Sequence, residues 1–175
     1  MTYVVVNSEV ETWVSRERDP EDEWDAGDTD GRVSNVTAWV DPTADRENQW
    51  YHGDSIVKQF PDDVTVGTTL YAVVADYSSG STFGRDGGHA QVLDAFTSVS
   101  EAESLRDAAL VTRDSGSWRK DYDYSFTWGE HEYSRGWAGY FEHLNSLDIW
   151  QIVVKPAATN FLNPDLASGG YKLGR

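Results

Sequence analysis

Alternating and clustered apolar residues divide the chain into several short β-type runs. Each run is rich in β-branched or aromatic residues and ends at glycine, proline or charged positions. We therefore predict strands over Tyr3–Val14, Val33–Val40, Ser55–Phe60, Thr68–Tyr77, Ala90–Phe96 and Leu147–Val154. Both alternating faces of the run Thr68–Tyr77 are apolar, which predicts a central strand of the sheet. In the run Ala90–Phe96, Val92 and Leu93 are expected on opposite faces.

One segment has helical rather than strand periodicity. Ser100 followed by Glu103 forms a capping-box pattern, and small or apolar residues then recur on one stripe as far as Thr112. Tyr122–Trp128 alternates aromatic with polar residues and is predicted to form a β-ribbon. The pattern predicts an α+β fold in a single domain over residues 1–175, with one main helix at about 100–112 packed on a mixed or mainly antiparallel sheet.

The remaining segments lack both periodicities. Arg16–Arg32 is predicted to be an acidic loop, because it combines a high density of carboxylates with Pro20, Gly27 and Gly31. Residues 41–53 and residues 138–147 are each predicted to be a loop or a short helical turn. The tail, residues 156–175, has little to bury, and we expect it to be partly mobile.

Charge narrows the classes of partner. The 175 residues include 30 acidic and 14 basic side chains, a net charge of −16. A field of that sign repels nucleic-acid phosphates and anionic membranes, so we expect no direct binding to either. The surplus acid serves solubility, reflects adaptation to a salty or high-GC background, or imitates nucleic acid towards a basic protein.

Cysteine is absent, which excludes disulfides, thiolate zinc sites and cysteine nucleophiles. This composition fits a reducing compartment. The first residues carry an acidic flank and a short apolar run, unlike a signal peptide or a membrane span. We therefore expect a soluble protein of the cytoplasm, or of the host cytoplasm for a phage protein.

A loop rich in glycine and hydroxyl groups follows the predicted central strand. Converging backbone N–H groups at its glycines could cradle an anion, with hydroxyl groups and Arg85 as further donors. No Gly-Lys-Ser/Thr follows at P-loop spacing, and no helix opens directly behind the loop as in a dinucleotide fingerprint. A long hairpin loop with ordinary turn chemistry explains the same pattern equally well. The candidate ligand-binding residues are Tyr77, Ser78, Ser79, Gly80, Ser81, Thr82, Phe83, Gly84, Arg85 and Tyr140.

Tyr140 belongs to an aromatic cluster in the same half of the chain. Its members are Tyr122, Tyr124, Phe126, Trp128, Tyr133, Trp137, Tyr140 and Phe141. Core packing explains most of this cluster, but an exposed strip of it beside a hydroxyl-rich loop would suit a nucleotide-like ligand, whose base could stack there.

No pattern in the chain specifies a reaction. His131 lies between Glu130 and Glu132, but neighbouring strand residues point to opposite faces and no HExxH pattern occurs. Ser79 or Ser81 with His89 could be assembled into a triad, yet the GxSxG elbow is absent. We therefore predict no catalytic residue, no metal and no cofactor.

Three segments resemble a family of small proteins from bacteriophages and actinobacteria. They read LYAVVADYSSGSTFGRDGG, then VLDAF with the capped helix after it, then WAGYFEHLNSLDIWQIVV. The family pairs a Y-S-x-G-x-x-F-G loop with a late G-Y-F-E segment. The matching residues, within about 68–154, are Tyr77, Ser78, Gly80, Thr82, Phe83, Gly84, Gly139, Tyr140, Phe141 and Glu142. The resemblance implies a phage or prophage origin, carries no catalytic residue and leaves the acidic N-terminal third uncovered.

Three functions are compatible with the sequence. The first is a non-catalytic protein that binds a small anionic, nucleotide-like ligand at Tyr77–Gly88 and sequesters a host defence signal. The second is an inhibitor whose acidic surface, especially Glu17–Asp30, imitates nucleic acid and occupies a basic host protein. The third, which we rank below both, is an enzyme acting on a nucleotide with His89 as its acid–base group.

Overall fold

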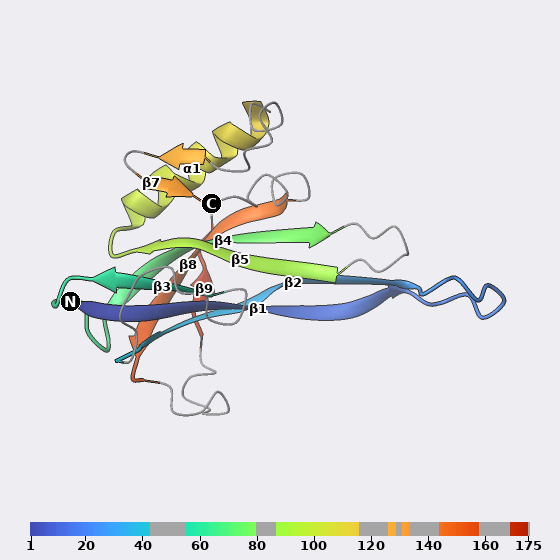
Figure 1. Cartoon of the computed structure of the whole chain (residues 1–175), viewed down its shortest axis with the longest axis horizontal. Coiled ribbons are helices and arrows are strands. Elements are labelled where there is room, and N and C mark those ends of the chain that lie inside the picture. The colour runs from blue at the N-terminus through green and yellow to red at the C-terminus, as the bar shows by residue number, and fades with distance from the viewer. Residues whose placement is uncertain are drawn as a thin grey trace.

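A computed structural model of the chain describes residues 1–42, 55–79, 87–115, 126–128, 131–133, 144–157 and 169–174. Strands predominate and one helix is described (Figure 1). In chain order the elements are β1 (Thr2–Arg16), β2 (Asp28–Val40), β3 (Ser55–Phe60), β4 (Thr69–Ser79), β5 (Gly87–Phe96), α1 (Val99–Ser115), β6 (Phe126–Trp128), β7 (His131–Tyr133), β8 (Leu144–Lys155) and β9 (Tyr171–Lys172).

Seven of these strands form one mixed sheet. Their order is β3-β1-β2-β8-β4-β5, with β9 added beside β8, while β6 and β7 form a separate two-stranded sheet. The pairing of β2 with β8 is parallel and the other pairings are antiparallel. The fold is therefore consistent with the predicted α+β class and its mixed or mainly antiparallel sheet, although strands predominate among the described elements. Strand β4 is an internal strand, as expected.

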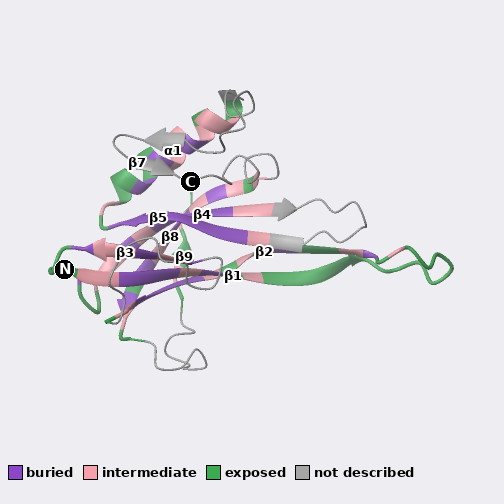
Figure 2. Cartoon of the chain, viewed as in Figure 1, coloured by how far each residue is buried: buried purple, intermediate pink, exposed green. Residues whose placement is uncertain are grey.

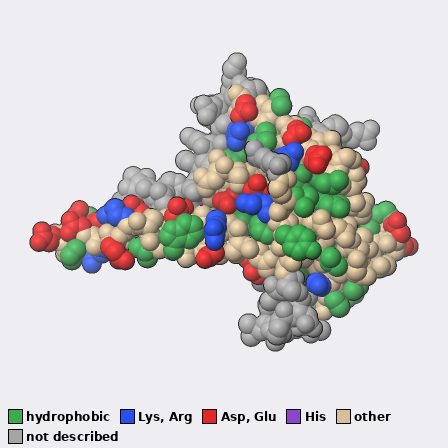
Figure 3. Space-filling model, turned by 180° about the vertical axis from the view of Figure 1, so that it is seen from behind, with side chains coloured by type: hydrophobic (Ala, Val, Ile, Leu, Met, Phe, Trp, Pro, Cys, Tyr) green, Lys and Arg blue, Asp and Glu red, His purple; other side chains and the backbone are tan. Residues whose placement is uncertain are grey.

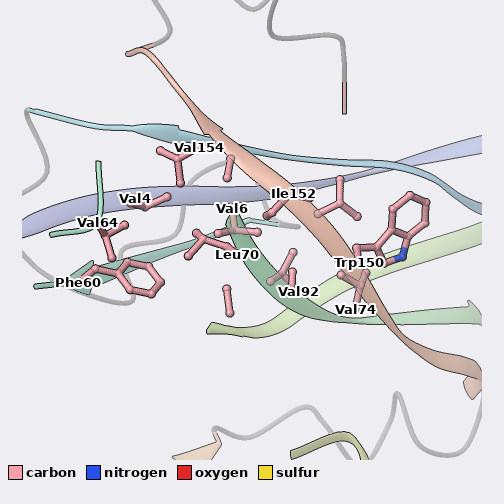
Figure 4. Close-up of a cluster of buried hydrophobic side chains, with 14 of the residues drawn as sticks. Val4, Val6, Phe60, Val64, Leu70, Val74, Val92, Trp150, Ile152 and Val154 are labelled. Atoms are coloured by element: carbon pink, nitrogen blue, oxygen red, sulfur yellow. The ribbon is translucent and has the colours of Figure 1, made fainter. Parts of the chain in front are cut away.

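The sheet curls so that its two ends approach each other around an apolar interior. One face of β1, β2 and β3 packs against one face of β4, β5 and β8 (Figure 4). This interior, the main core, includes Val4, Val6, Phe60, Leu70, Val74, Val92, Trp150 and Ile152. Lys58 of β3 and Asp94 of β5 form an ion pair of 2.9 Å between the two end strands. The arrangement is nearly that of a closed barrel.

Helix α1 covers the other face of β4, β5 and β8. Leu105 and Ala109 pack there against Val73 and Leu147, together with Leu93. Leu93 and Val92 therefore lie on opposite faces of β5, as predicted. The helix begins at Val99, one residue before the predicted start. The Ser98 carbonyl accepts the N–H of Ala102 (3.3 Å), so Ser98 rather than Ser100 is the N-cap.

Part of the tail is bound rather than loose. Strand β9 pairs with β8, the Gly170 N–H donates to the Val36 carbonyl of β2 (2.8 Å), and the Leu173 N–H donates to the Ile149 carbonyl (2.8 Å). These bonds place residues 169–173 at the seam between β2 and β8, which pair directly at two positions. Backbone pairing therefore holds residues 169–173, and such pairing needs no apolar sequence signal.

Several boundaries differ from the prediction. Strand β2 begins at Asp28, so the predicted loop Arg16–Arg32 shortens to the residues between Arg16 and Asp28. Strand β8 begins at Leu144, inside the segment predicted to be a loop or helical turn. The β6–β7 pair realises the end of the predicted ribbon, whereas residues 43–54, 122–125 and 138–143 lie outside the described residues.

Candidate functional site

The structure describes only the base of the glycine-rich loop. Strands β4 and β5 continue as a hairpin to its edge, with Ser78 opposite Gly88 and Ser79 opposite Gly87. Of the candidate residues, Tyr77, Ser78 and Ser79 therefore lie at the end of β4. Gly80, Ser81, Thr82, Phe83, Gly84, Arg85 and Tyr140 lie outside the described residues. An antiparallel hairpin is what the alternative interpretation, ordinary turn chemistry, also predicts.

Two rings meet at the base of this hairpin. Tyr77 and His89 are directly opposite each other, and their rings stack with centroids 5.1 Å apart and planes inclined by 20°. Tyr77 also packs at the edge of the apolar cluster under α1 that includes Val73, Leu105 and Leu147. The pair offers a planar aromatic surface next to the loop. His89, an acid–base candidate from the sequence, is one of the two stacked rings.

A carboxylate that the sequence interpretation did not single out lies one residue earlier. Asp76 Oδ2 accepts the Val33 N–H from β2 (3.1 Å), while the buried Oδ1 has no hydrogen-bond partner among the described residues. Burial raises the pKa of Asp76, and the nearby Asp148 carboxylate raises it further, against hydrogen bonds from Val33 and Asn145 that lower it. Two carboxyl groups, Asp76 and Asp148, thus lie near the base of the loop against one ammonium group, Lys172, which disfavours an anion there.

The raised pKa of Asp76 leads us to expect an unusual pH dependence of the stability of the protein. A carboxyl group whose folded-state pKa is raised adds stability below its unfolded pKa, and that stability is lost as the pH rises through the folded pKa. At pH 7 the charge is therefore unfavourable, and Asp76→Asn is expected to raise the melting temperature by about 1–3 °C. The gain should shrink towards pH 4. Asp63→Asn, at an exposed position, controls for the loss of one negative charge. Equal shifts in both variants would contradict this account.

The most exposed feature of the molecule is a projecting two-stranded ribbon. Beyond the body, the outer halves of β1 and β2 run side by side, from Glu11 opposite Arg32 to Arg16 opposite Asp28 (Figure 1). We call residues 11–32 the arm. Nearly all of it is exposed (Figure 2). It holds nine carboxylates and three arginines, which leaves six surplus negative charges.

The tip of the arm is fixed by a clasp around Arg16 and Asp25. The Arg16 guanidinium donates to both Asp25 carboxylate oxygens (2.8 and 2.7 Å) and, through Nε, to Asp28 Oδ2 (2.8 Å). The Asp25 carboxylate also accepts the N–H groups of Asp19 and Gly27, each at 2.9 Å. The hydrogen bond from Arg16, followed by these backbone bonds, holds the pKa of Asp25 well below its ordinary range.

Glycine is required within this clasp. Gly27 has φ +74°, in the left-handed region, and a Cβ there would lie 2.8 Å from the Arg16 carbonyl oxygen. The turn is closed by the Asp25 N–H bonding the Asp22 carbonyl (3.1 Å), while Asp22 Oδ1 accepts the Trp24 N–H (3.0 Å). The tip is therefore a defined structure rather than a plain acidic loop.

This defined tip presents large apolar side chains to solvent. Trp24 is 85% exposed, and Trp13 and Val14 on the ribbon are 44% and 57% exposed. On the face that Figure 3 shows, acidic side chains and a smaller number of hydrophobic ones lie along the arm. The sequence interpretation missed the tryptophans because Trp13 sits in a strand pattern and Trp24 in a segment without periodicity.

Comparison with known proteins adds no relative: no family model, no curated protein and no solved structure matches this chain. The resemblance to small phage and actinobacterial proteins therefore stays a prediction. Within the described residues, no helix is long and apolar enough to cross a membrane.

Proposed function

We propose that this chain is a non-catalytic binding protein whose acidic arm docks against a basic surface of another protein. One observation carries the proposal: a hydrogen-bonded tip that displays a tryptophan 85% exposed, on a ribbon with six surplus negative charges. This is the second of the three functions that the sequence allows, and the described geometry favours it over the others.

The arm has features that the body of the fold does not need. A two-stranded ribbon is marginal on its own in water, yet this one extends well past the main core and is held by the Arg16–Asp25 clasp. Exposed indoles enlarge the apolar surface, and such surface on a polar background is typical of protein contacts. The carboxylates repel nucleic acid and anionic membranes and attract a basic protein.

A matched pair of charge reversals tests the proposal. Glu21→Lys with Glu23→Lys alters the arm, whereas Asp63→Lys with Glu103→Lys alters exposed positions on the body. Each substitution adds two charges, so both variants change the net charge from −16 to −12. Asp22 is left intact because it bonds the Trp24 N–H. We expect the immobilised wild-type and body-reversed chains to retain the same basic protein from a cell extract, and the arm-reversed chain to lose it. Equal retention by all three would contradict the proposal.

A second candidate function is binding of a small nucleotide-like ligand at Tyr77–Gly88. The Tyr77–His89 stack supports it, because a planar surface beside a glycine-rich loop suits a base. The nearby Asp76 and Asp148 carboxylates weaken it for an anionic ligand. Calorimetric titration with mono- and cyclic nucleotides should show binding that Arg85→Ala weakens about tenfold or more if this candidate is right.

The resemblance to phage proteins bears on where the partner is found. It implies that a basic partner belongs to the host cell and that the two proteins meet in the host cytoplasm. In that setting occupation of the partner's basic surface would block its contact with nucleic acid, which is how an acidic mimic acts in counter-defence.

A further inference from the structure

We infer, on the basis of the proposed function, that the arm recognises arginine side chains of its partner through exposed indoles flanked by carboxylates. The arm displays this combination twice. Trp24 at the tip directly follows Glu23 in the chain, and Trp13 lies directly opposite Asp30 across the ribbon. Neither indole belongs to a hydrophobic core cluster of the described residues.

Arginine fits this combination better than lysine. The guanidinium group is planar and weakly hydrated, so it stacks on an indole face while donating two hydrogen bonds to one carboxylate. A lysine ammonium is compact and strongly hydrated, and it gains less from either contact. An accessible indole with carboxylates beside it therefore selects between two side chains of equal charge.

The clasp fixes the conformation of the tip before a partner binds. Because Arg16 and the backbone already occupy the Asp25 carboxylate, the tip does not have to order itself on binding. Glu21 and Glu23, close to Trp24 in the chain, are exposed and take no part in the clasp through their side chains. The same internal Arg16–Asp25 pair shows the two-point geometry that a partner arginine would adopt with a carboxylate.

Other binding partners are less suited to the arm than an arginine-rich protein surface. A second copy of this chain would bring six surplus negative charges against six more, and an anionic membrane would repel the arm in the same way. Trp13 and Val14, as neighbours in a strand, point to opposite faces of the ribbon. Apolar contacts are thus available on both faces and at the tip, which suits a partner that surrounds the arm.

Two peptides of equal charge test the inference on the full chain. Fluorescently labelled nona-arginine and nona-lysine are titrated with the wild-type protein at about 0.15 M salt, where exposed charges more than roughly 8 Å apart are largely screened. We expect nona-arginine to bind about fivefold or more tightly than nona-lysine, the size of effect that one or two cation–π contacts produce. The variant with both Trp13→Ala and Trp24→Ala should lose this preference and bind the two peptides alike. Tyr171→Ala removes an exposed aromatic ring away from the arm and should keep the preference.

The outcomes separate this inference from the proposed function. Equal binding of the two peptides by the wild type, or a preference that survives loss of both tryptophans, overturns the arginine inference. The proposed function still stands in that case if Glu21→Lys with Glu23→Lys weakens both peptides more than Asp63→Lys with Glu103→Lys does. Equal weakening by the arm and body reversals overturns the proposed function itself. Unchanged melting curves for the tryptophan variant show that the fold is intact, as its exposed positions lead us to expect.

Discussion

Replacing Lys58 by methionine is expected to lower the free energy of unfolding by about 2–4 kcal/mol, towards the range for breaking a buried ion pair. Lys58 Nζ bonds Asp94 Oδ1 (2.9 Å) and the Ala95 carbonyl (2.7 Å), and lies 4.3 Å from the Phe96 ring centroid. The Lys58 and Asp94 side chains are 23% and 11% exposed. Loss of the ammonium group therefore leaves a mostly buried carboxylate without its cation, at the junction of the first and last strands of the sheet.

A double variant separates the missing charge from the missing packing. Lys58→Met with Asp94→Asn removes both charges and keeps an oxygen that can accept the Ala95 N–H (2.8 Å). We expect it to recover at least half of the stability lost in Lys58→Met, as measured by urea unfolding. A single variant as stable as the wild type would show that the ion pair does not close the sheet. A double variant no more stable than Lys58→Met would show that lost packing, rather than the unpaired carboxylate, causes the destabilisation.

Replacing Gly170 by alanine is expected to destabilise the seam between β2 and β8. A Cβ at Gly170 would lie 2.3 Å from Ile152 Cγ2 and 2.4 Å from the Gln151 carbonyl oxygen. Neither a buried core residue nor strand backbone can move that far without loss, and overpacking of this kind costs about 1–3 kcal/mol. The Gly170 N–H bond to the Val36 carbonyl (2.8 Å) should weaken with it.

Gly174→Ala is the matched control, because nothing lies within 4 Å of a Cβ at that position. Hydrogen exchange at the backbone amides of position 170 and of Leu173 reports the seam directly. Faster exchange in Gly170→Ala but not in Gly174→Ala is expected. Unchanged exchange and stability in both variants would mean that the tail does not hold the seam.

Local patterning predicted the strands and the helix of this fold well. Alternation along β5 predicted that Val92 and Leu93 lie on opposite faces of the sheet, and each packs in a different apolar cluster. Apolar residues on both faces of Leu70–Val74 predicted that this strand is internal. The run Ser55–Phe60 matches β3 in both bounds. These features depend on neighbouring residues in the chain, which a sequence pattern records.

Features set by distant residues could not be predicted in this way. The Lys58–Asp94 pair joins residues 36 positions apart, and Asp76 Oδ2 accepts the Val33 N–H of β2, 43 positions away. The extension of β2 back to Asp28 depends on the Arg16 clasp, which offsets the unfavourable strand composition of the arm. Of the predicted loop site the structure describes only the base, where the Tyr77 and His89 rings stack.

The most direct test of the account is the affinity of the arm for its basic partner. Once the protein retained by the immobilised chain has been purified, its dissociation constant is measured with the wild type, with Glu21→Lys plus Glu23→Lys, and with Asp63→Lys plus Glu103→Lys. The account predicts a loss of about tenfold or more for the arm reversal and less than about threefold for the body reversal, at equal net charge and equal salt. Equal losses in the two variants would contradict it, because the arm would then be no more than part of a uniformly acidic surface.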